Sequence, residues 1–411
     1  MRVHHLLCLA VSIHFTARAQ TPEGADPKKL EAVAPSLQKF VDEGQLSGAV
    51  VLAAYQGKVI SEEAVGFRDL ATKDPMTKDA LFWIASMTKP ITSLGVMILQ
   101  DEKKLDINDP VEKYLPEFRG QMLLSEKKDD TVILKNPTRP ITIKDLLMHT
   151  SGLTSSSPLD KDAIDVLSLK EAVITYALTP LQFDPGSKWS YCNPGMNTLG
   201  RIIEVVSGVE YSRFIQTRIF NPLRMKDTTF WPDKKHLQKL ATSYKPTSDG
   251  KSLEPTPIKY LTPPFSNRKR TPLAAGGLFS TAEDLLKLYT MLLDGGQANG
   301  KRLISMASLK EMTTIQSGDL KTGFTDGMAM GLGFHIVKEP TGVTSMLSPG
   351  TYGHGGAHGT QGWIDPERKV IYILLIQRAG LKNGDASPMR QAFQEAIANA
   401  LPPVVKAAVK P

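Results

Sequence analysis

Strand patterns occur near both ends of this 411-residue chain, whereas helical patterns fill its middle. Residues 48–54 and 59–65 flank the turn sequence Tyr55-Gln56-Gly57-Lys58 and predict a β-hairpin. The last third of the chain predicts four further strands, at residues 331–337, 351–355, 359–364 and 369–377. Because isolated hairpins bury too little apolar surface, we expect the two ends of the chain to share one sheet.

Apolar residues at helical spacing predict the helices. They cover residues 30–41, 143–149, 169–178, 196–206, 211–220, 282–293, 307–314 and 391–401. The predicted fold class is α+β, with an antiparallel sheet of N- and C-terminal strands flanked by helices and a mostly helical second domain. The α/β part covers about residues 30–90 and 275–401, and the helical part about 91–274, within one unit over residues 20–411.

Two segments of the middle stand apart from these helices. Residues 119–136 are predicted to be an insertion with a small charged hairpin around residues 127–130. Residues 234–271 are polar, Pro-rich and basic, and we predict them to be the least ordered part of the mature chain, which begins at residue 20.

The first 19 residues resemble a secretory signal peptide. Arg2 precedes an apolar run at residues 6–13, and Ala17-Arg18-Ala19 matches a small-x-small cleavage site. The run is too short to span a bilayer, so we expect no transmembrane segment and a periplasmic or secreted protein. A short buried helix is the alternative. Cleavage would remove Cys8 and leave Cys192 alone, which excludes an internal disulfide.

Ser86 and Lys89 lie three residues apart at the start of a predicted helix, so their side chains share a helical face. A serine hydroxyl is a poor nucleophile at neutral pH, but a desolvated amine within hydrogen-bond reach can accept its proton. Ser86 is therefore the candidate nucleophile and Lys89 its candidate base. The pattern Ser-x-x-Lys begins at five serines, so context must decide: Ser36, Ser86, Ser125, Ser248 and Ser266.

The surroundings of Ser86 separate it from the other four serines. An apolar run at residues 81–85 precedes it, and Pro90 falls in the first helical turn, where a missing N–H does no harm. A serine at the buried N-terminus of a helix has free N–H groups and a favourable dipole for an oxyanion. The other serines lie on an exposed amphipathic helix or in polar, charged segments.

Tyr191 and Asn193 form a second candidate motif, before a predicted helix. Tyr191 is the only one of ten tyrosines that is followed two residues later by asparagine. Its phenol is a candidate for moving the proton of the leaving group if a neighbouring cation lowers its pKa. Asn193 is a candidate to hold a substrate carbonyl or Lys89. A tyrosine packed on a loop beside a helix-capping asparagine is the structural alternative.

The third candidate motif is the glycine-rich sequence of residues 352–360. Glycines in a strand allow a substrate to approach the backbone, which suits Gly355 and Gly356 to substrate binding along a sheet edge. His354 would add a hydrogen-bond donor near Ser86, and the Ala357 N–H would complete an oxyanion hole with the N–H of the serine.

In this order, the motifs resemble those of the penicillin-recognising serine hydrolases, which include class C β-lactamases, serine DD-peptidases and family VIII carboxylesterases. The three motifs are Ser86 to Lys89, Tyr191 to Asn193, and His354 to Gly356. Two further segments also resemble recurring family segments, at residues 149–153 and 275–278. The resemblance covers about residues 37–401. It implies a β-lactamase/transpeptidase-like fold and an acyl-enzyme on Ser86, without metal or organic cofactor.

Lys321-Thr322-Gly323 spells a common form of the third family motif literally. Its neighbours have the composition of a loop, and the predicted strand at residues 331–337 follows only afterwards. The resemblance places the third motif on the strand that lines the serine, which favours His354 over Lys321.

The resemblance also bears on the substrate. Family members that bind β-lactams or peptide C-termini often carry a hydroxyl where this chain has Gly355. Its loss removes a charge-assisted hydrogen bond to a substrate carboxylate, worth about 1.5–3 kcal/mol. A neutral ester needs no such contact. The favoured small-molecule substrate is therefore a carboxylic ester, with a β-lactam second and a D-alanyl peptide third; a non-catalytic relative that binds cell-wall peptide is the alternative of another class.

Other chemistries find no support in the sequence. No Gly-x-Ser-x-Gly elbow is present, and the histidines lack metal-binding spacing. His335, in an apolar strand, is interpreted as a hydrogen-bonded core residue. The net charge of +7 is scattered, and Arg268-Lys269-Arg270 has no interleaved aromatic residues, so we expect no nucleic-acid partner.

Overall fold

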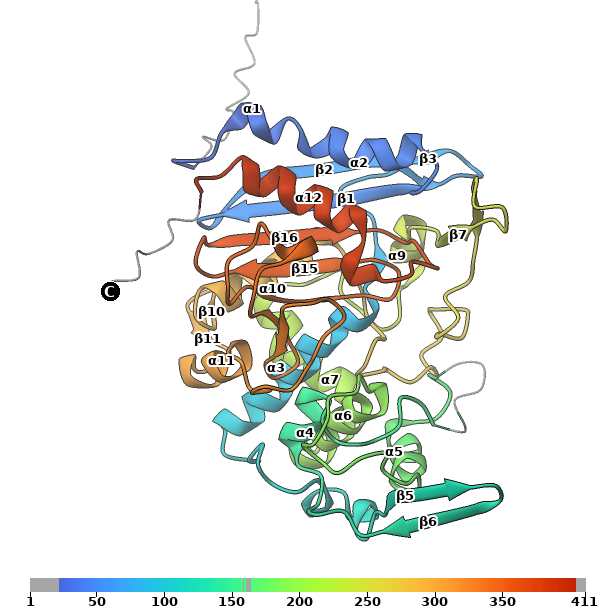
Figure 1. Cartoon of the computed structure of the whole chain (residues 1–411). Helices are drawn as coiled ribbons and strands as arrows, with labels where there is room; N and C mark the ends of the chain where they lie inside the picture. Colours follow the sequence, from blue (N-terminus) through green and yellow to red (C-terminus); the bar gives the residue numbers. More distant parts are fainter. Residues whose placement is uncertain (1–21, 158, 160–163, 404–411) are drawn as a thin grey trace, which may run out of the picture.

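The computed structural model describes residues 22–157, 159 and 164–403, so the predicted signal peptide lies outside the described residues. An eight-stranded antiparallel sheet combines both ends of the chain, as the sequence predicts (Figure 1). Its strand order is β12-β13-β14-β15-β16-β1-β2-β3. The strands are β1 (Gly48–Tyr55), β2 (Lys58–Asp69), β3 (Asp74–Pro75), β12 (Met328–Met330), β13 (His335–Val337), β14 (Tyr352–Gly355), β15 (Gln361–Asp365) and β16 (Val370–Leu375).

The junction between the two ends of the chain is the pairing of β1 with β16, from Val50 opposite Leu375 to Tyr55 opposite Val370. Every residue of β1 is buried, because both faces of the sheet are covered. Val50 and Leu52 join the core on one face, and Val51 joins the core on the other. The two-residue period of the strand thus divides its apolar side chains between two cores.

Helices of both chain ends cover one face of the sheet. These are α1 (Pro27–Leu30), α2 (Val33–Asp42) and α12 (Pro388–Asn399), which lie together at the top of Figure 1. The core beneath them includes Leu37 of α2, Phe393 of α12 and Tyr372 of β16. The chain therefore begins and ends its described part on the same layer.

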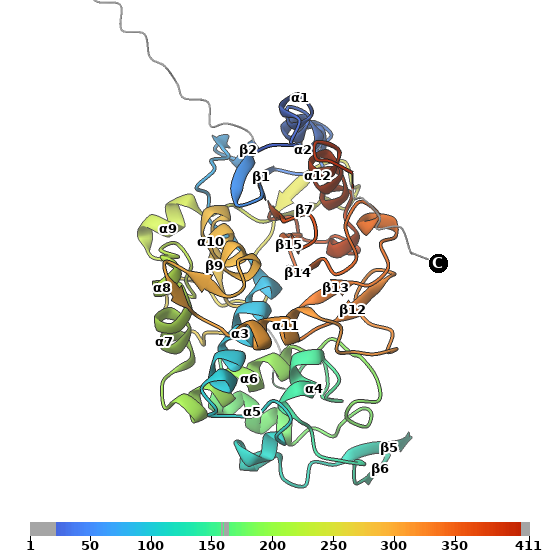
Figure 2. The ribbon, with the colours of Figure 1, turned by 90° about the vertical axis from the view of Figure 1, so that its left-hand side faces the viewer.

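The other face of the sheet packs on α3 (Thr88–Asp101) and α10 (Ala282–Leu293), and the helical part continues beyond them (Figures 1 and 2). Further helices are α4 (Ile143–Met148), α5 (Leu169–Ala177), α6 (Asn193–Ser207), α7 (Tyr211–Ile215), α8 (Asn221–Leu223), α9 (Lys234–Lys239) and α11 (Met306–Thr313). Short strand pairs are β4 (Phe82–Trp83) with β9 (Phe279–Ser280) and β10 (Gln297–Ala298) with β11 (Lys301–Arg302). None of the helices in the described part has the length and apolar character to cross a membrane.

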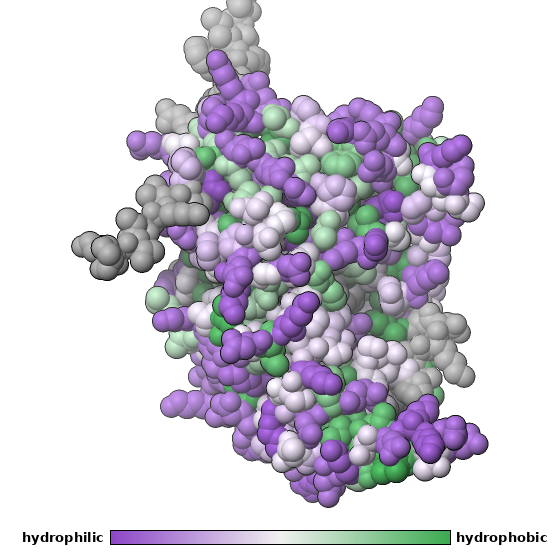
Figure 3. Space-filling model, viewed as in Figure 1, coloured by the Kyte–Doolittle hydropathy of each residue, from purple (hydrophilic) through white to green (hydrophobic). Residues whose placement is uncertain are grey.

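The predicted insertion forms a hairpin of β5 (Leu123–Lys128) and β6 (Thr131–Lys135) at the far end of the helical part. The charged residues lie at its tip, as predicted. Val132, Ile133 and Leu134 of β6 are exposed, and Figure 3 shows apolar side chains at this end of the molecule.

The prediction of little order in residues 234–271 is wrong. The segment contains α9 and a hairpin of β7 (Tyr244–Pro246) with β8 (Leu253–Pro255). It also contains Arg270, whose buried guanidinium pairs with the buried carboxylate of Asp165 at 2.6 Å. Polar composition misled the prediction, because these polar groups are satisfied by partners that lie far away in the sequence.

Candidate active site

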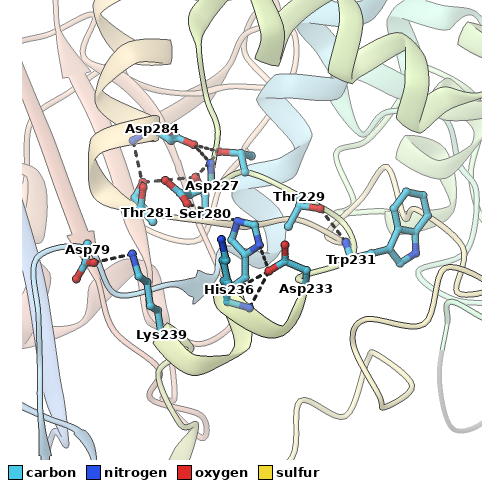
Figure 4. A network of polar contacts seen from close by, with 12 residues as sticks. Asp79, Asp227, Thr229, Trp231, Asp233, His236, Lys239, Ser280, Thr281 and Asp284 are labelled. Atoms are coloured by element: carbon cyan, nitrogen blue, oxygen red, sulfur yellow. Dashed lines mark hydrogen bonds and ion pairs between the residues drawn. The ribbon is translucent and has the colours of Figure 1, made fainter.

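Contacts from distant segments hold the strand that leads to Ser86. β4 pairs with β9, and the Ile84 N–H donates to the carbonyl of Leu278 (3.0 Å). The Leu81 N–H donates to the carbonyl of Lys239 at the end of α9 (2.8 Å), and the Lys239 side chain pairs with Asp79 (2.7 Å; Figure 4). The backbone segment that precedes Ser86 is therefore held on two sides.

Ser86 is the accessible point of an otherwise buried run. Every residue from Ala80 to Leu99 is buried except Ser86, which is half-buried. The serine lies in the 3₁₀ turn Ala85–Met87 that leads into α3. Ala85 has φ 46°, a left-handed conformation that is uncommon for a residue with a side chain. Such a conformation costs free energy and persists where the surrounding structure enforces it, which is typical of functional sites.

Lys89 reaches the serine from the first turn of α3. Its Nζ lies 2.9 Å from the Oγ of Ser86 and donates to the carbonyl oxygen of Ala275 at 2.6 Å. The lysine is fully buried, and burial lowers its pKa well below 10.5. Burial thus favours the uncharged amine, which is the form that accepts a proton.

The segment that holds Lys89 is itself held by α6. The Ala275 N–H donates to the Oδ1 of Asn197 (3.0 Å), and the Nδ2 of Asn197 donates to the hydroxyl of Tyr176 (3.3 Å). The sequence marked residues 275–278 as a recurring segment but assigned no role to Asn197. An asparagine in the middle of an apolar helical pattern was the signal that could have identified it.

Tyr191 lies on the other side of Lys89, whose Nζ is 4.6 Å from the centre of the tyrosine ring. Burial raises the pKa of Tyr191, although its hydrogen bond with Ser86 acts in the opposite direction. The condition that a neighbouring cation lowers this pKa is therefore not met, because Lys89 is driven toward its uncharged form. A neutral phenol beside the serine is a proton donor rather than a base.

β14 brings the third motif beside the serine but is not an edge strand. Its pairing with β13 ends at His335 opposite Gly353, so His354 and Gly355 have no strand partner on that side within the described residues. The next residue, Gly356, packs closely against the backbone of Ile84, since a Cβ on it would lie 2.6 Å from the Ile84 carbonyl oxygen. The sheet thus offers an open half-strand next to Ser86.

The N–H groups of Ser86 and Ala357 are available for an oxyanion. Among the described residues, neither N–H donates a hydrogen bond to the protein. The Gly356 N–H donates to the carbonyl of Thr360 (2.7 Å), which closes the turn that carries Ala357. Free N–H groups beside a nucleophile have the character that an oxyanion hole requires.

His354 offers an acceptor where the sequence predicted a donor. Its Nδ1 lies 2.6 Å from the carbonyl oxygen of Gly355, and a carbonyl only accepts, so Nδ1 carries the proton. Burial lowers the pKa of His354 well below 6.5, which favours the neutral ring and leaves Nε2 as an acceptor. This buried Nε2 has no hydrogen-bond partner in the described structure.

Two further buried histidines line the site, His149 beside Tyr191 and His335 beside His354. The ring of His149 is 4.6 Å from that of Tyr191, and the ring of His335 is 4.8 Å from that of His354. His335 is buried in the core, as predicted, but the prediction that it is hydrogen-bonded fails at its Nε2, which has no partner among the described residues. No group of these or other ligand-type side chains in the described residues has the arrangement to hold a metal ion.

The literal third motif lies outside this arrangement. Lys321 is exposed on a loop and lines a surface pocket of about 600 Å³. The same loop nevertheless sends Phe324 into the site, where its ring is 5.0 Å from that of Tyr191 and 5.6 Å from that of His335. Sequence reasoning missed Phe324, because a phenylalanine in a loop carries no signal of its destination.

Asn193 and Gly355, the two remaining residues predicted to bind substrate, do not have the surroundings that the sequence suggested. Asn193 begins α6, and no hydrogen bond in the described structure joins it to Lys89, whose partners are Ser86 and Ala275. Gly355 does not face empty space: a Cβ there would lie 2.0 Å from the Oδ1 of Asp385.

Known proteins are similar to this chain in sequence and in fold. The Beta-lactamase family model matches residues 33–396. Protein Rv1367c of Mycobacterium tuberculosis is 32% identical over 372 residues, covering 86% of this chain and 91% of its own length. Lovastatin esterase of Penicillium rubens is 29% identical over 396 residues, covering 88% and 96%. The structure of EstCE1, a hydrolase with promiscuous acyltransferase activity, aligns with a TM-score of 0.75 at 25% identity, covering 90% and 99%.

Proposed function

The chain belongs to the Beta-lactamase family and is a serine hydrolase of that fold, and from this premise we propose that it hydrolyses carboxylic esters through an acyl-enzyme on Ser86. One observation carries the proposal: the Nζ of buried Lys89 lies 2.9 Å from the Oγ of Ser86, the half-buried residue of the run from Ala80 to Leu99. A nucleophile within reach of substrate thus has a desolvated base at hydrogen-bond distance.

In the acylation step, the Oγ of Ser86 attacks the ester carbonyl carbon while the Nζ of Lys89 accepts the serine proton. The N–H groups of Ser86 and Ala357 stabilise the oxyanion. The bond to the leaving oxygen then breaks, and that oxygen takes the phenol proton of Tyr191. Lys89 returns a proton to Tyr191, so the serine proton ends on the alcohol product.

In the deacylation step, water attacks the acyl-serine and its proton passes to the same uncharged pair, Lys89 and Tyr191. The bond between the acyl carbon and the Oγ of Ser86 then breaks, and the serine recovers a proton. The products are a carboxylic acid and the free enzyme. No group other than the protein's own side chains and water takes part in this proposal.

Two features of the site favour an ester over a β-lactam. His354 offers an acceptor through Nε2, and Gly355 offers no hydroxyl, so neither supplies a donor for the carboxylate that β-lactams carry. Lovastatin esterase, by its name, acts on an ester. β-Lactam hydrolysis is the second candidate, because it uses the same acylation of Ser86.

The test compares p-nitrophenyl esters of several acyl chain lengths with a chromogenic cephalosporin, using the wild type and Ser86→Ala. We expect ester turnover that Ser86→Ala abolishes, and mass spectrometry should detect the acyl group on Ser86. A fluorophosphonate should label the wild type only. Faster turnover of the cephalosporin would favour the second candidate, and neither turnover nor labelling would indicate a binding protein.

We also propose that the enzyme acts after export, in the periplasm or outside the cell. The support is the signal-peptide pattern of residues 1–19. Expression of the full chain with N-terminal sequencing tests this proposal. A mature protein that begins at Gln20 is the expected result, and an unprocessed chain that stays in the cytoplasm would contradict it.

A further inference from the structure

Asp385 lies beside the open half of β14, although it comes from the segment between β16 and α12. It belongs to the short 3₁₀ turn Gly384–Ala386, whose start is capped by Asn383 through a bond to the Asp385 N–H (3.0 Å). The guanidinium of Arg390, in α12, donates to the Asp385 carbonyl at 2.7 Å. The backbone of Asp385 is therefore held from both sides.

The Asp385 carboxylate occupies the place of a side chain on β14. A Cβ at Gly355 would lie 2.0 Å from its Oδ1 and 2.5 Å from the Nε2 of Gln361. That amide donates to the same Oδ1 at 2.9 Å. Glycine at position 355 is thus required by the acid, because any larger residue would displace it.

Within the described residues, the Asp385 side chain forms no ion pair, although its charge acts on the buried Arg390, where it opposes the lowering of the arginine pKa by burial. Asp165 is paired with Arg270, but no ion pair joins Asp385 to a cation in the described part of the chain. Arg390 contacts only the backbone carbonyl of Asp385 by hydrogen bond. A half-buried carboxylate whose partner is a neutral amide keeps its attraction for other cations.

The charge of Asp385 reaches the catalytic groups. Burial is the largest cause of the raised pKa of Tyr191, and the hydrogen bond with Ser86 opposes it; the Asp385 carboxylate adds a smaller effect that raises the pKa further. It also acts against the burial that lowers the pKa of His335. Two buried bases of the site, Lys89 and His354, are driven toward their neutral forms. Asp385 is thus the acidic group that acts on Tyr191 and His335 along β14, while Arg390 acts on His335 in the opposite direction.

We propose that Asp385 is a specificity-determining residue, which disfavours substrates with an anionic group beside β14 and favours esters with a neutral or cationic group there. The inference rests on the proposed ester hydrolysis and names its substrate class. It also replaces the simpler view of Gly355 as a missing hydroxyl: the position is filled by an acceptor of opposite character. Repulsion of a like charge in a partly buried cleft discriminates against the charged substrate by about tenfold.

Three acetyl esters of matched shape test the proposal: 3-acetoxybenzoate, its methyl ester, and the (3-acetoxyphenyl)trimethylammonium ion. The quantity measured is kcat/KM of Asp385→Asn divided by that of the wild type, because this ratio cancels the different reactivities of the leaving groups. We expect the ratio to rise about tenfold for the anion, fall about tenfold for the cation and stay within about twofold for the neutral ester. Added salt should weaken the wild-type discrimination.

Asp129→Asn is the matched control, since it removes one negative charge at the exposed tip of the β5–β6 hairpin. All three ratios should equal one in this variant. Equal changes for the three esters in Asp385→Asn, or salt-independent discrimination in the wild type, would overturn the role of Asp385 while leaving ester hydrolysis intact. A wild type that does not hydrolyse even the neutral ester would overturn both proposals.

Discussion

Gly356 packs so closely against Ile84 that a Cβ on the glycine would lie 2.6 Å from the Ile84 carbonyl oxygen. The two residues are far apart in the chain; Gly356 directly precedes Ala357, and Ile84 lies two residues before Ser86, whose N–H groups are assigned to the oxyanion hole. The hydroxyl of Thr360 also reaches the Ile84 carbonyl (3.4 Å). This contact therefore sets the distance between the Ser86 and Ala357 N–H groups.

Gly356→Ala is expected to lower kcat about 10- to 100-fold by moving Ala357 away from Ser86. The clash should also lower the free energy of unfolding by about 1–3 kcal/mol. Steady-state kinetics and urea unfolding measure the two effects. Gly195→Ala is the control, because a Cβ at this buried helical position would have only ordinary contacts, the nearest at 3.5 Å. Unchanged kcat in Gly356→Ala would contradict the assigned contact.

Lys89→Met is expected to abolish turnover and to change the pH dependence of stability. Burial lowers the pKa of Lys89 well below 10.5, so unfolding takes up a proton at pH values between the folded and unfolded pKa values. The wild-type free energy of unfolding therefore gains up to about 1.4 kcal/mol per pH unit as pH rises through that range. The variant lacks this gain. Urea unfolding of both proteins at about pH 8, 9 and 10 measures it, and a constant difference would refute the uncharged amine.

His354→Ala is expected to lower kcat/KM about 10- to 100-fold, because it removes a buried group beside Tyr191 and the open half of β14. Lys321→Ala serves as the control and should leave turnover nearly intact, since this lysine is exposed on its loop. Steady-state kinetics with one p-nitrophenyl ester suffices. The reverse pattern would reassign the third motif to residues 321–323.

Asn197→Leu tests how the base is positioned. The variant leaves the Ala275 N–H without its acceptor, which costs about 1–3 kcal/mol of stability and frees the carbonyl that holds Lys89. We expect kcat to fall about tenfold with KM within about twofold, because substrate contacts are unaffected. Tyr176→Phe is the control, as it removes a hydrogen bond of the Asn197 amide but leaves Ala275 in place. Equal losses in both variants would indicate a purely structural role for Asn197.

Local patterns predicted much of the fold correctly. Hydrophobic periodicity identified β1, β16 and most helices within a few residues, because each pattern reflects one element and the side it buries. The pairing of Ser86 with Lys89 could also be predicted, since residues three apart on a helix meet without help from the rest of the chain. The order in residues 234–271 could not be predicted, because it depends on distant partners such as Asp165.

The sequence by itself determined the pairing of Ser86 with Lys89 and the sheet built from both chain ends. Only the tertiary structure decided what surrounds them: the Ala275 carbonyl on Lys89, the Phe324 ring on Tyr191 and the Asp385 carboxylate on β14. These contacts join residues more than 20 positions apart, and no local pattern encodes which of many loop residues will meet. The protonation of the site also depends on the fold, because burial drives Lys89 and His354 toward their neutral forms.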